Sequence, residues 1–558
     1  MPSLNGFSAP VAPGRRRPGV AAALRCGAAL AVALAALAGP PASAPAQGAE
    51  QVRREGAADN AFAARLPAPA SVTRELALPE GRLRYVAAAG ALPLYDNNGR
   101  LQAEVGYVAY TLAPDGAQPP HRRPVTFVVN GGPGASSAWL NFGGLGPRVV
   151  AFGNPGDTPS TAPLLEDNPD TWLAFTDLVF IDPPGTGFSR MDQQEQTRRR
   201  LWSVDGDIAA LARFISRYLT EHGRMTSPKY LVGESYGGFR VPKLAHALQT
   251  SAGVGVNGVV MLSPVLDFAR LGPDADAVIG YAALLPSMAA AKLEREGRLT
   301  PEALAGAEAY AAGDMVLDLL RGPADAAARE RLAAGVARFT GLDPELARRY
   351  GGRVDARAFA REFRRAAGET ASLYDAGVTG PDPWPFDPDR RVDDPVLEGA
   401  QAALSSAAVD EITRGIGWKA EGPYRLLSDQ VNRNWNWGRG LRPPEALSAL
   451  QAARALDPRM KILVAHGYGD LVTPYFQSRL DLARLPPLAG AEPLLFRTYP
   501  GGHMFYTRES SRRAFRDDAR ALYDRRDAQN RAPQPPAAAP GAQSPETQSP
   551  QSPSQKPR

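Results

Sequence analysis

The stretch that decides the fold is KYLVGESYGG, residues 229–238. The apolar run at 230–232 indicates a buried strand over 229–232, and residues 239–248 continue as a helix. Between them stands Gly-x-Ser-x-Gly, with Ser235 at its centre. Between a strand and a helix this motif is a nucleophile elbow, a turn so tight that only glycine fits two residues on either side of the serine. The context predicts a serine hydroxyl presented above the edge of a sheet.

Other apolar runs place this elbow inside a larger α/β core. Strands are predicted at residues 125–129, 177–182, 258–262, 461–465 and 495–499, and an amphipathic helix at 207–219. From about 270 to 440 the chain is rich in Ala, Arg and Glu, with helical periodicity and few strand signals. We therefore predict one α/β core, with a mostly parallel sheet and helices on both faces, interrupted by a helical insertion.

Composition shifts divide the 558 residues further. A chain of this length can bury a large core and hold more than one compact unit. The predicted parts are a secretory signal peptide at 1–46, a flexible lead-in at 47–79, the first half of the core at 80–269, the helical insertion or cap at 270–440, the second half of the core at 441–526, and a disordered Pro/Gln/Ser-rich tail at 527–558.

The first 46 residues have the pattern of an export signal. Three arginines, at 15–17, precede an uninterrupted small and apolar run at 26–38, which is too short to span a bilayer. Cleavage after Ala46 is favoured over cleavage after Ala44, because Pro45 would follow the earlier site. An uncleaved anchor and twin-arginine export are the alternatives. We expect an exported protein, periplasmic or secreted, with no stable membrane insertion after cleavage.

Charge and cysteine content exclude several classes of function. The net charge is +5, but four arginines lie in the first 44 residues, so the rest of the chain is nearly neutral. No basic stripe interleaved with aromatics is present, and we expect no nucleic-acid partner. The only cysteine, Cys26, lies in the signal. The mature chain would have neither disulfides nor a thiol nucleophile, and we expect no cofactor and no metal site.

A serine nucleophile needs a base to take its proton and an acid to orient that base. Among the five histidines, His503 follows a predicted strand in a glycine-containing loop and is the favoured base, with His466 as the runner-up. Asp470, in the loop after the strand at 461–465, is the acid. The order Ser235, Asp470, His503 is that of the α/β-hydrolase fold.

The same chemistry needs hydrogen-bond donors for the tetrahedral oxyanion. The backbone N–H of Tyr236, directly after the nucleophile, is one candidate. The glycine loop at 130–134, after an early core strand, is where this fold places the other. No Gly-Lys-Ser/Thr follows that loop, which excludes a phosphate-binding loop.

At this point the sequence resembles the serine carboxypeptidase family of the carboxypeptidase Y type. NGGPGASS at 130–137, DPPGTGFS at 182–189 and GESYGG at 233–238 are similar to three of its signatures, and Asp470 and the GHM at 502–504 fit two more. The resemblance implies release of single residues from peptides with a free C-terminus. The residues it implies are the triad Ser235, Asp470 and His503, the oxyanion donors Gly132 and Tyr236, and Asn130, Gly131 and Glu234 for the substrate carboxylate.

The chain departs from the family at one position of this site. Where eukaryotic members have a second glutamate that pairs with the one matching Glu234, this sequence has Gly144. Two carboxylates in contact repel, so Glu234 can share a hydrogen bond with a substrate carboxylate only while one proton lies between them. The alternative is that Glu234 braces the elbow. The alternative functions are an esterase or acyltransferase with the same triad, and an exported binding protein on a hydrolase scaffold.

Overall fold

The computed structural model describes residues 65–113, 122–152, 165–271, 278–387, 390–438, 440 and 442–530, the last six without side chains. The predicted signal peptide, His121 and the end of the predicted tail, residues 531–558, lie outside these residues. Among the helices described, none combines the length and the apolar character needed to cross a membrane.

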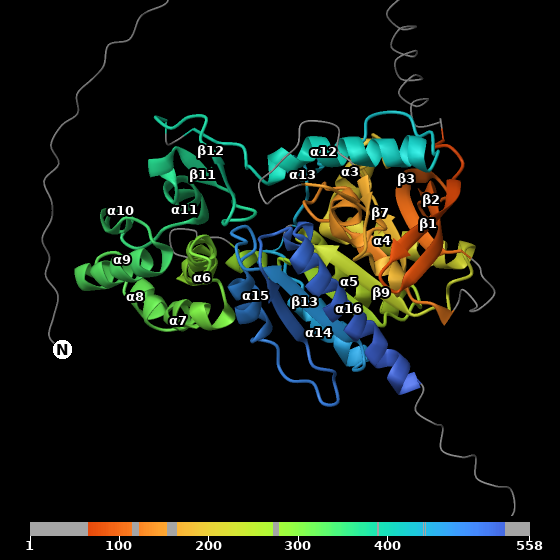
Figure 1. The fold of residues 1–558 in the computed structure, drawn as a ribbon. Helices are drawn as coiled ribbons and strands as arrows, with labels where there is room; N and C mark the ends of the chain where they lie inside the picture. Colours follow the sequence, from red (N-terminus) through yellow and green to blue (C-terminus); the bar gives the residue numbers. More distant parts are fainter. Residues whose placement is uncertain are drawn as a thin grey trace, which may run out of the picture. The chain divides into compact units, whose positions relative to one another are not determined.

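A mixed ten-stranded sheet forms the centre of the described residues (Figure 1). Six neighbouring strands are parallel, and β1, β2, β3 and β8 extend one edge by antiparallel pairing. In spatial order the strands are β1 (Ala70–Leu78), β2 (Gly81–Tyr95), β3 (Leu101–Leu112), β7 (Asp177–Ile181), β4 (Val125–Val129), β9 (Lys229–Glu234), β10 (Gly258–Leu262), β13 (Lys461–Gly467) and β14 (Leu495–Tyr499), with β8 (Arg190–Met191) paired to β3.

Two hydrophobic clusters cover the two faces of this sheet. Phe127 and Val128 of β4 belong to different clusters, and Leu231 and Val232 of β9 divide in the same way, since successive strand side chains point to opposite faces. Helices therefore cover both faces, as predicted. The first face is packed by α4 (Val204–Glu221), α5 (Tyr236–Ser251) and α14 (Leu447–Leu456), and the second by α2 (Ala138–Leu140), α12 (Leu397–Asp410) and α16 (Glu509–Asn530).

Between β10 and β13 the described residues add no strand to the central sheet. The helices in the first part of this segment, drawn in green in Figure 1, supply most of a third hydrophobic cluster. This part of the segment contains α6 (Val278–Arg295), α7 (Pro301–Ala312), α8 (Asp314–Leu320), α9 (Ala326–Thr340), α10 (Pro344–Arg349), α11 (Ala356–Glu362) and a two-stranded sheet of β11 (Glu369–Ala371) and β12 (Thr379–Pro381). Later in the segment, α13 (Asp429–Arg433) follows α12.

Shorter elements connect these parts. They include β5 (Arg148–Val150) paired with β6 (Leu165–Asp167), the helices α3 (Glu195–Leu201) and α15 (Tyr475–Leu482), and the short turns η2 (Asn141–Leu145), η3 (Trp172–Ala174), η4 (Phe268–Arg270), η5 (Arg365–Ala367), η6 (Glu411–Gly415) and η7 (Phe505–Thr507).

Two predicted boundaries are wrong. The lead-in at 47–79 was expected to be flexible, but β1 occupies 70–78 and pairs with β2 along its whole length. Leu76 is buried, while Ser71, Thr73 and Glu75 are exposed, the alternation of a half-buried strand. At the other end, α16 continues to residue 530, past the predicted start of the tail at 527.

Candidate active site

Ser235 stands at the junction of β9 and α5, as the predicted strand–turn–helix requires. Its φ of 60° and ψ of −122° are unusual for a residue with a side chain. A Cβ on Gly233 would lie 2.1 Å from the carbonyl oxygen of Gly237, and a Cβ on Gly237 would lie 2.5 Å from the carbonyl oxygen of Val129. Glycine is therefore needed on both sides of the serine, because backbone occupies the space of a side chain.

The loops after β13 and β14 bring Asp470 and His503 together. His503 Nδ1 lies 2.8 Å from Asp470 Oδ2, and both side chains are buried. Asp470 Oδ1 accepts the backbone N–H groups of Val472 and Thr473, at 2.8 and 2.9 Å. Its Oδ2 also lies 2.7 Å from the hydroxyl of Thr473. The orientation of the carboxylate is thus set by its own loop, and one oxygen is directed at the imidazole.

Burial lowers the pKa of His503, but the charge and hydrogen bond of Asp470 and the charge of Glu234 raise it further, so the pKa is raised overall. His466, the runner-up base, is fully buried in β13 against the ring of Phe496. Burial lowers the pKa of His466 to about 3. The structure therefore places His503, rather than His466, against the predicted acid.

The glycine loop at 130–134 follows β4, whose Val129 pairs with Gly233 of β9. This register places the loop directly beside Ser235. A Cβ on Gly131 would lie 2.6 Å from the backbone nitrogen of Tyr236 and 2.9 Å from the Cβ of Ser235. Gly132 has a φ of +100°, a conformation that favours glycine. The glycine loop, which contains the predicted donor Gly132, thus lies against the backbone N–H of Tyr236, the other predicted donor.

Asn130 and Glu234 form a buried polar cluster next to Ser235. The side-chain amide of Asn130 donates to Glu234 Oε2, and its Oδ1 accepts the backbone N–H of Leu140 at 3.0 Å. The hydroxyl of Tyr506 donates to Glu234 Oε1 at 2.6 Å. Burial raises the pKa of Glu234, while the charge of His503 and these two hydrogen bonds lower it, and the balance is a raised pKa.

Sequence reasoning missed the residues that support this cluster. Arg240 of α5 and Asp207 of α4 form a fully buried ion pair, 2.5 Å from Nε to Oδ2, and Arg240 also donates to the carbonyl oxygen of Asn130. A buried charge pair between two helices has no local signal, because each residue alone looks like one polar position in an amphipathic helix. The hydroxyl of Tyr506 was missed because its partner, Glu234, lies 272 residues earlier in the sequence.

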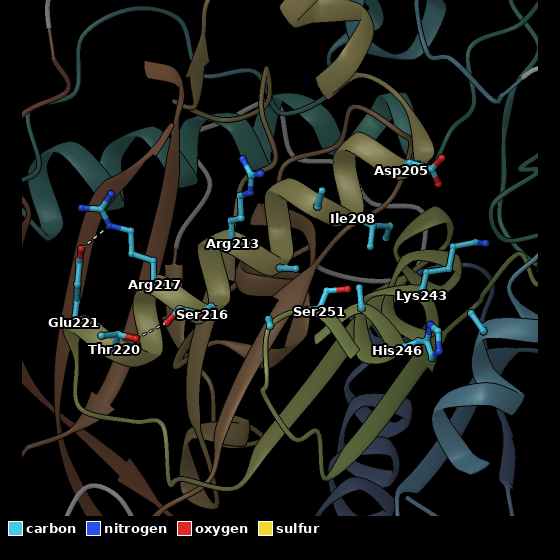
Figure 2. Close-up of a pocket in the computed structure, with 15 residues that line it drawn as sticks. Asp205, Ile208, Arg213, Ser216, Arg217, Thr220, Glu221, Lys243, His246 and Ser251 are labelled. Atoms are coloured by element: carbon cyan, nitrogen blue, oxygen red, sulfur yellow. Dashed lines mark hydrogen bonds and ion pairs between the residues drawn. The ribbon is translucent and has the colours of Figure 1, made fainter. Parts of the chain in front are cut away.

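Two large hollows on the described surface differ in how close they lie to the predicted site residues. One, of about 1110 Å³, runs along α4 and α5 and is lined by side chains such as Arg213, Lys243 and His246 (Figure 2). None of the predicted site residues lines it, so we do not assign the substrate to it. The other, of about 790 Å³, is lined by Trp139 and Met504, neighbours of the glycine loop and of His503.

Asp182, directly after β7, is hydrogen-bonded to the segment that follows the glycine loop. Its Oδ1 accepts the backbone N–H of Ser137 at 2.8 Å. Burial raises the pKa of Asp182 to about 7, against hydrogen bonds from Ser137 and Tyr424 that lower it. An unfolded aspartate loses its proton near pH 4, so the folded state binds more protons between about pH 4 and 7. The contribution of Asp182 to stability therefore falls as the pH rises through this window.

We expect Asp182→Asn to stabilise the protein relative to wild type by a few kcal/mol more at pH 8 than at pH 5, since asparagine stays neutral. Urea unfolding of both proteins at the two pH values measures this. Asp429→Asn, at a surface position, is the control and should give the same difference at both pH values. Parallel behaviour of Asp182→Asn and wild type would contradict the burial of an ionising carboxyl at this position.

Part of the chain is similar in sequence to known proteins. Residues 109–277 match the sequence profile of the serine carboxypeptidase family. The chain is 34% identical over 143 residues to serine carboxypeptidase-like 50 of Arabidopsis thaliana, covering 25% of this chain and 30% of that protein. It is 34% identical over 122 residues to the pheromone-processing carboxypeptidase kex1 of Sclerotinia sclerotiorum, covering 22% and 17%. These alignments span less than a third of each relative.

A solved structure extends the likeness of the fold over most of the chain. The prohormone-processing carboxypeptidase Kex1(delta)p from Saccharomyces cerevisiae superposes with a TM-score of 0.50 at 15% identity, covering 79% of this chain and 91% of that one. The fold is that of the α/β-hydrolases. Within this fold, the match to the serine carboxypeptidase family covers the segment that carries the glycine loop and the elbow.

Proposed function

We propose that this protein is a serine carboxypeptidase that releases C-terminal amino acids from peptides. The observation that carries the proposal is the placement of the buried Asn130–Glu234 pair directly beside the Ser235 elbow and the His503–Asp470 pair. A nucleophile and its base alone serve any acyl transfer. A buried carboxyl group one residue from the nucleophile adds a means to select substrates that end in a carboxylate.

In the proposed reaction the hydroxyl of Ser235 attacks the carbonyl carbon of the last peptide bond while His503 Nε2 takes its proton. Asp470 keeps the other proton of the ring on Nδ1, which their 2.8 Å contact supports. The backbone N–H groups of Gly132 and Tyr236 stabilise the oxyanion. His503 then protonates the departing amine, and water hydrolyses the acyl group on Ser235 by the reverse sequence of proton transfers.

The terminal carboxylate of the peptide is held by Asn130, the backbone of Gly131 and Glu234. Glu234 Oε1 and Oε2 already accept hydrogen bonds from Tyr506 and Asn130, so an ionised Glu234 offers an incoming carboxylate only repulsion. A protonated Glu234 can donate instead. The raised pKa of Glu234 favours this protonated form.

The free acid and the C-terminal amide of one N-blocked dipeptide test this function across pH 4 to 8. We expect cleavage of the free acid to dominate, with kcat/KM falling about tenfold per pH unit once Glu234 ionises. Glu234→Gln should flatten this alkaline limb, because a carboxamide donates at every pH. Equal cleavage of acid and amide, together with hydrolysis of a simple ester, would indicate an esterase or acyltransferase in which Glu234 braces the elbow.

We also propose that the protein is exported, to the periplasm or the medium. The support is the sequence pattern at its start, in which a basic stretch, a short apolar run and small residues follow in the order of a cleavable signal. On this proposal the peptide substrates are met outside the cytoplasm.

A further inference from the structure

Tyr506 packs against two consecutive glycines of η2. It lies in η7, three residues after His503, and is fully buried. A Cβ on Gly143 would lie 2.9 Å from Cε2 of the tyrosine ring, and a Cβ on Gly144 would lie 2.8 Å from Cδ2. The two glycines form a flat wall against which the ring lies. Gly144 and Tyr506 are therefore one packing unit, because a side chain at 144 would need the space of the ring.

The hydroxyl of this ring completes the coordination of Glu234. It donates to Oε1 at 2.6 Å, while Asn130 donates to Oε2 from the opposite loop. Both hydrogen bonds hold the carboxyl group in one orientation. Two carboxylates in contact repel, so a substrate carboxylate can join this group only while one proton lies between it and Glu234.

Several titratable groups face Glu234 besides Tyr506. His503 and Asp470 come from the loops after β14 and β13, and Tyr374 comes from the segment between β12 and β11. The charge of His503 lowers the pKa of Glu234, and that of Asp470 raises it. The hydroxyl of Tyr506 lowers it by a hydrogen bond to the charged form. Removing that hydroxyl alone leaves the other groups in place.

We propose that Tyr506 is the positioning residue of the carboxylate subsite: its hydroxyl holds Glu234 toward the substrate, and its ring fills the space over Gly144. The inference rests on the proposed function and deepens it. The terminal carboxylate of the peptide is then recognised by a single titrating carboxyl group whose partner is a phenol. The Tyr506–Glu234 hydrogen bond then shifts the pH range over which free-acid peptides bind, together with burial and the charge of His503.

Tyr506→Phe tests the proposal, with kcat and KM measured for the free acid and the amide from pH 4 to 8. The alkaline limb for the free acid should move up by about one pH unit, because Glu234 loses a donor to its charged form. Below that limb, KM for the free acid should rise about tenfold with little change in kcat, since Glu234 is held less firmly. The amide should show neither change.

Tyr499→Phe is the matched control. Tyr499 is also buried and donates to a carboxylate at 2.8 Å, but this carboxylate is Asp518 of α16 and not Glu234. Gly144→Ala is a second variant, which displaces the ring from its wall and should reproduce the shifted limb even if Tyr506→Phe does not fold. Thermal unfolding of each variant monitors the fold.

The outcomes separate the two proposals. If the alkaline limb of the free-acid pH profile moves in Tyr506→Phe or Gly144→Ala, and stays in place in Tyr499→Phe, the result supports the role of Tyr506. Profiles that coincide with wild type, while wild type prefers free acids, overturn that role and leave the carboxypeptidase function standing. A wild-type protein without preference for free acids overturns both.

Discussion

Ser235→Ala is expected to lower kcat for peptide hydrolysis by at least about 10⁴-fold while the protein remains folded. In the proposed reaction this serine supplies the oxygen that forms the acyl-enzyme, and alanine has no hydroxyl for His503 to activate. The backbone at this position has a φ of 60°, and alanine carries the same Cβ as serine. The substitution therefore adds no strain to the elbow, and the unfolding temperature should stay near that of wild type.

Covalent labelling of the serine checks the same assignment. A fluorophosphonate should label wild type at one serine, found by peptide mass spectrometry at Ser235, and should not label the variant. Ser263→Ala is the control, because Ser263 also has a positive φ, of 41°, and its hydroxyl donates to the carbonyl oxygen of His503. It should keep the label. Turnover retained by Ser235→Ala would exclude Ser235 as the nucleophile.

The core strands could be predicted from sequence because parallel strands are buried on both faces. The mainly apolar segments at 125–129 and 258–262 became β4 and β10 with the predicted bounds, and both strands are buried throughout. The first strand could not be read in this way. β1 lies at the edge of the sheet with one face exposed, and its alternation includes Arg74 at a half-buried position, where an ion pair with Glu411 stabilises it.

The candidate site also contains residues that local sequence motifs predict and residues that they do not. Local motifs were enough to select Ser235 and the glycine loop, because tight turns require glycine at fixed spacings. The pairing of Tyr506 with Glu234 joins residues 272 positions apart and depends on the wall formed by Gly144. Sequence reasoning identified the departure at position 144 but could not find what fills the space, since that is a property of packing between η2 and η7.

Asp470→Asn is the second large effect, an expected loss of about 10³- to 10⁴-fold in kcat. The orientation of the new carboxamide is dictated by its loop. Asp470 Oδ1 accepts two backbone N–H groups, so the oxygen of asparagine must stay on that side and its NH₂ group must face His503. A donor opposite Nδ1 forces the ring proton onto Nε2. The imidazole then cannot take the proton of Ser235.

Thr473→Val separates this tautomer effect from a general loosening of the loop. The hydroxyl of Thr473 lies 2.7 Å from Asp470 Oδ2, and its removal leaves the carboxylate opposite His503 Nδ1. We expect a loss of about tenfold, in keeping with the loss of one hydrogen bond to a carboxylate. Nitrogen-15 NMR of the imidazole should show the Nδ1–H tautomer in wild type and Thr473→Val, and the Nε2–H tautomer in Asp470→Asn. Equal losses in the two variants, with one tautomer throughout, would mean that Asp470 only shapes its loop, and the base would then have to be oriented by another group.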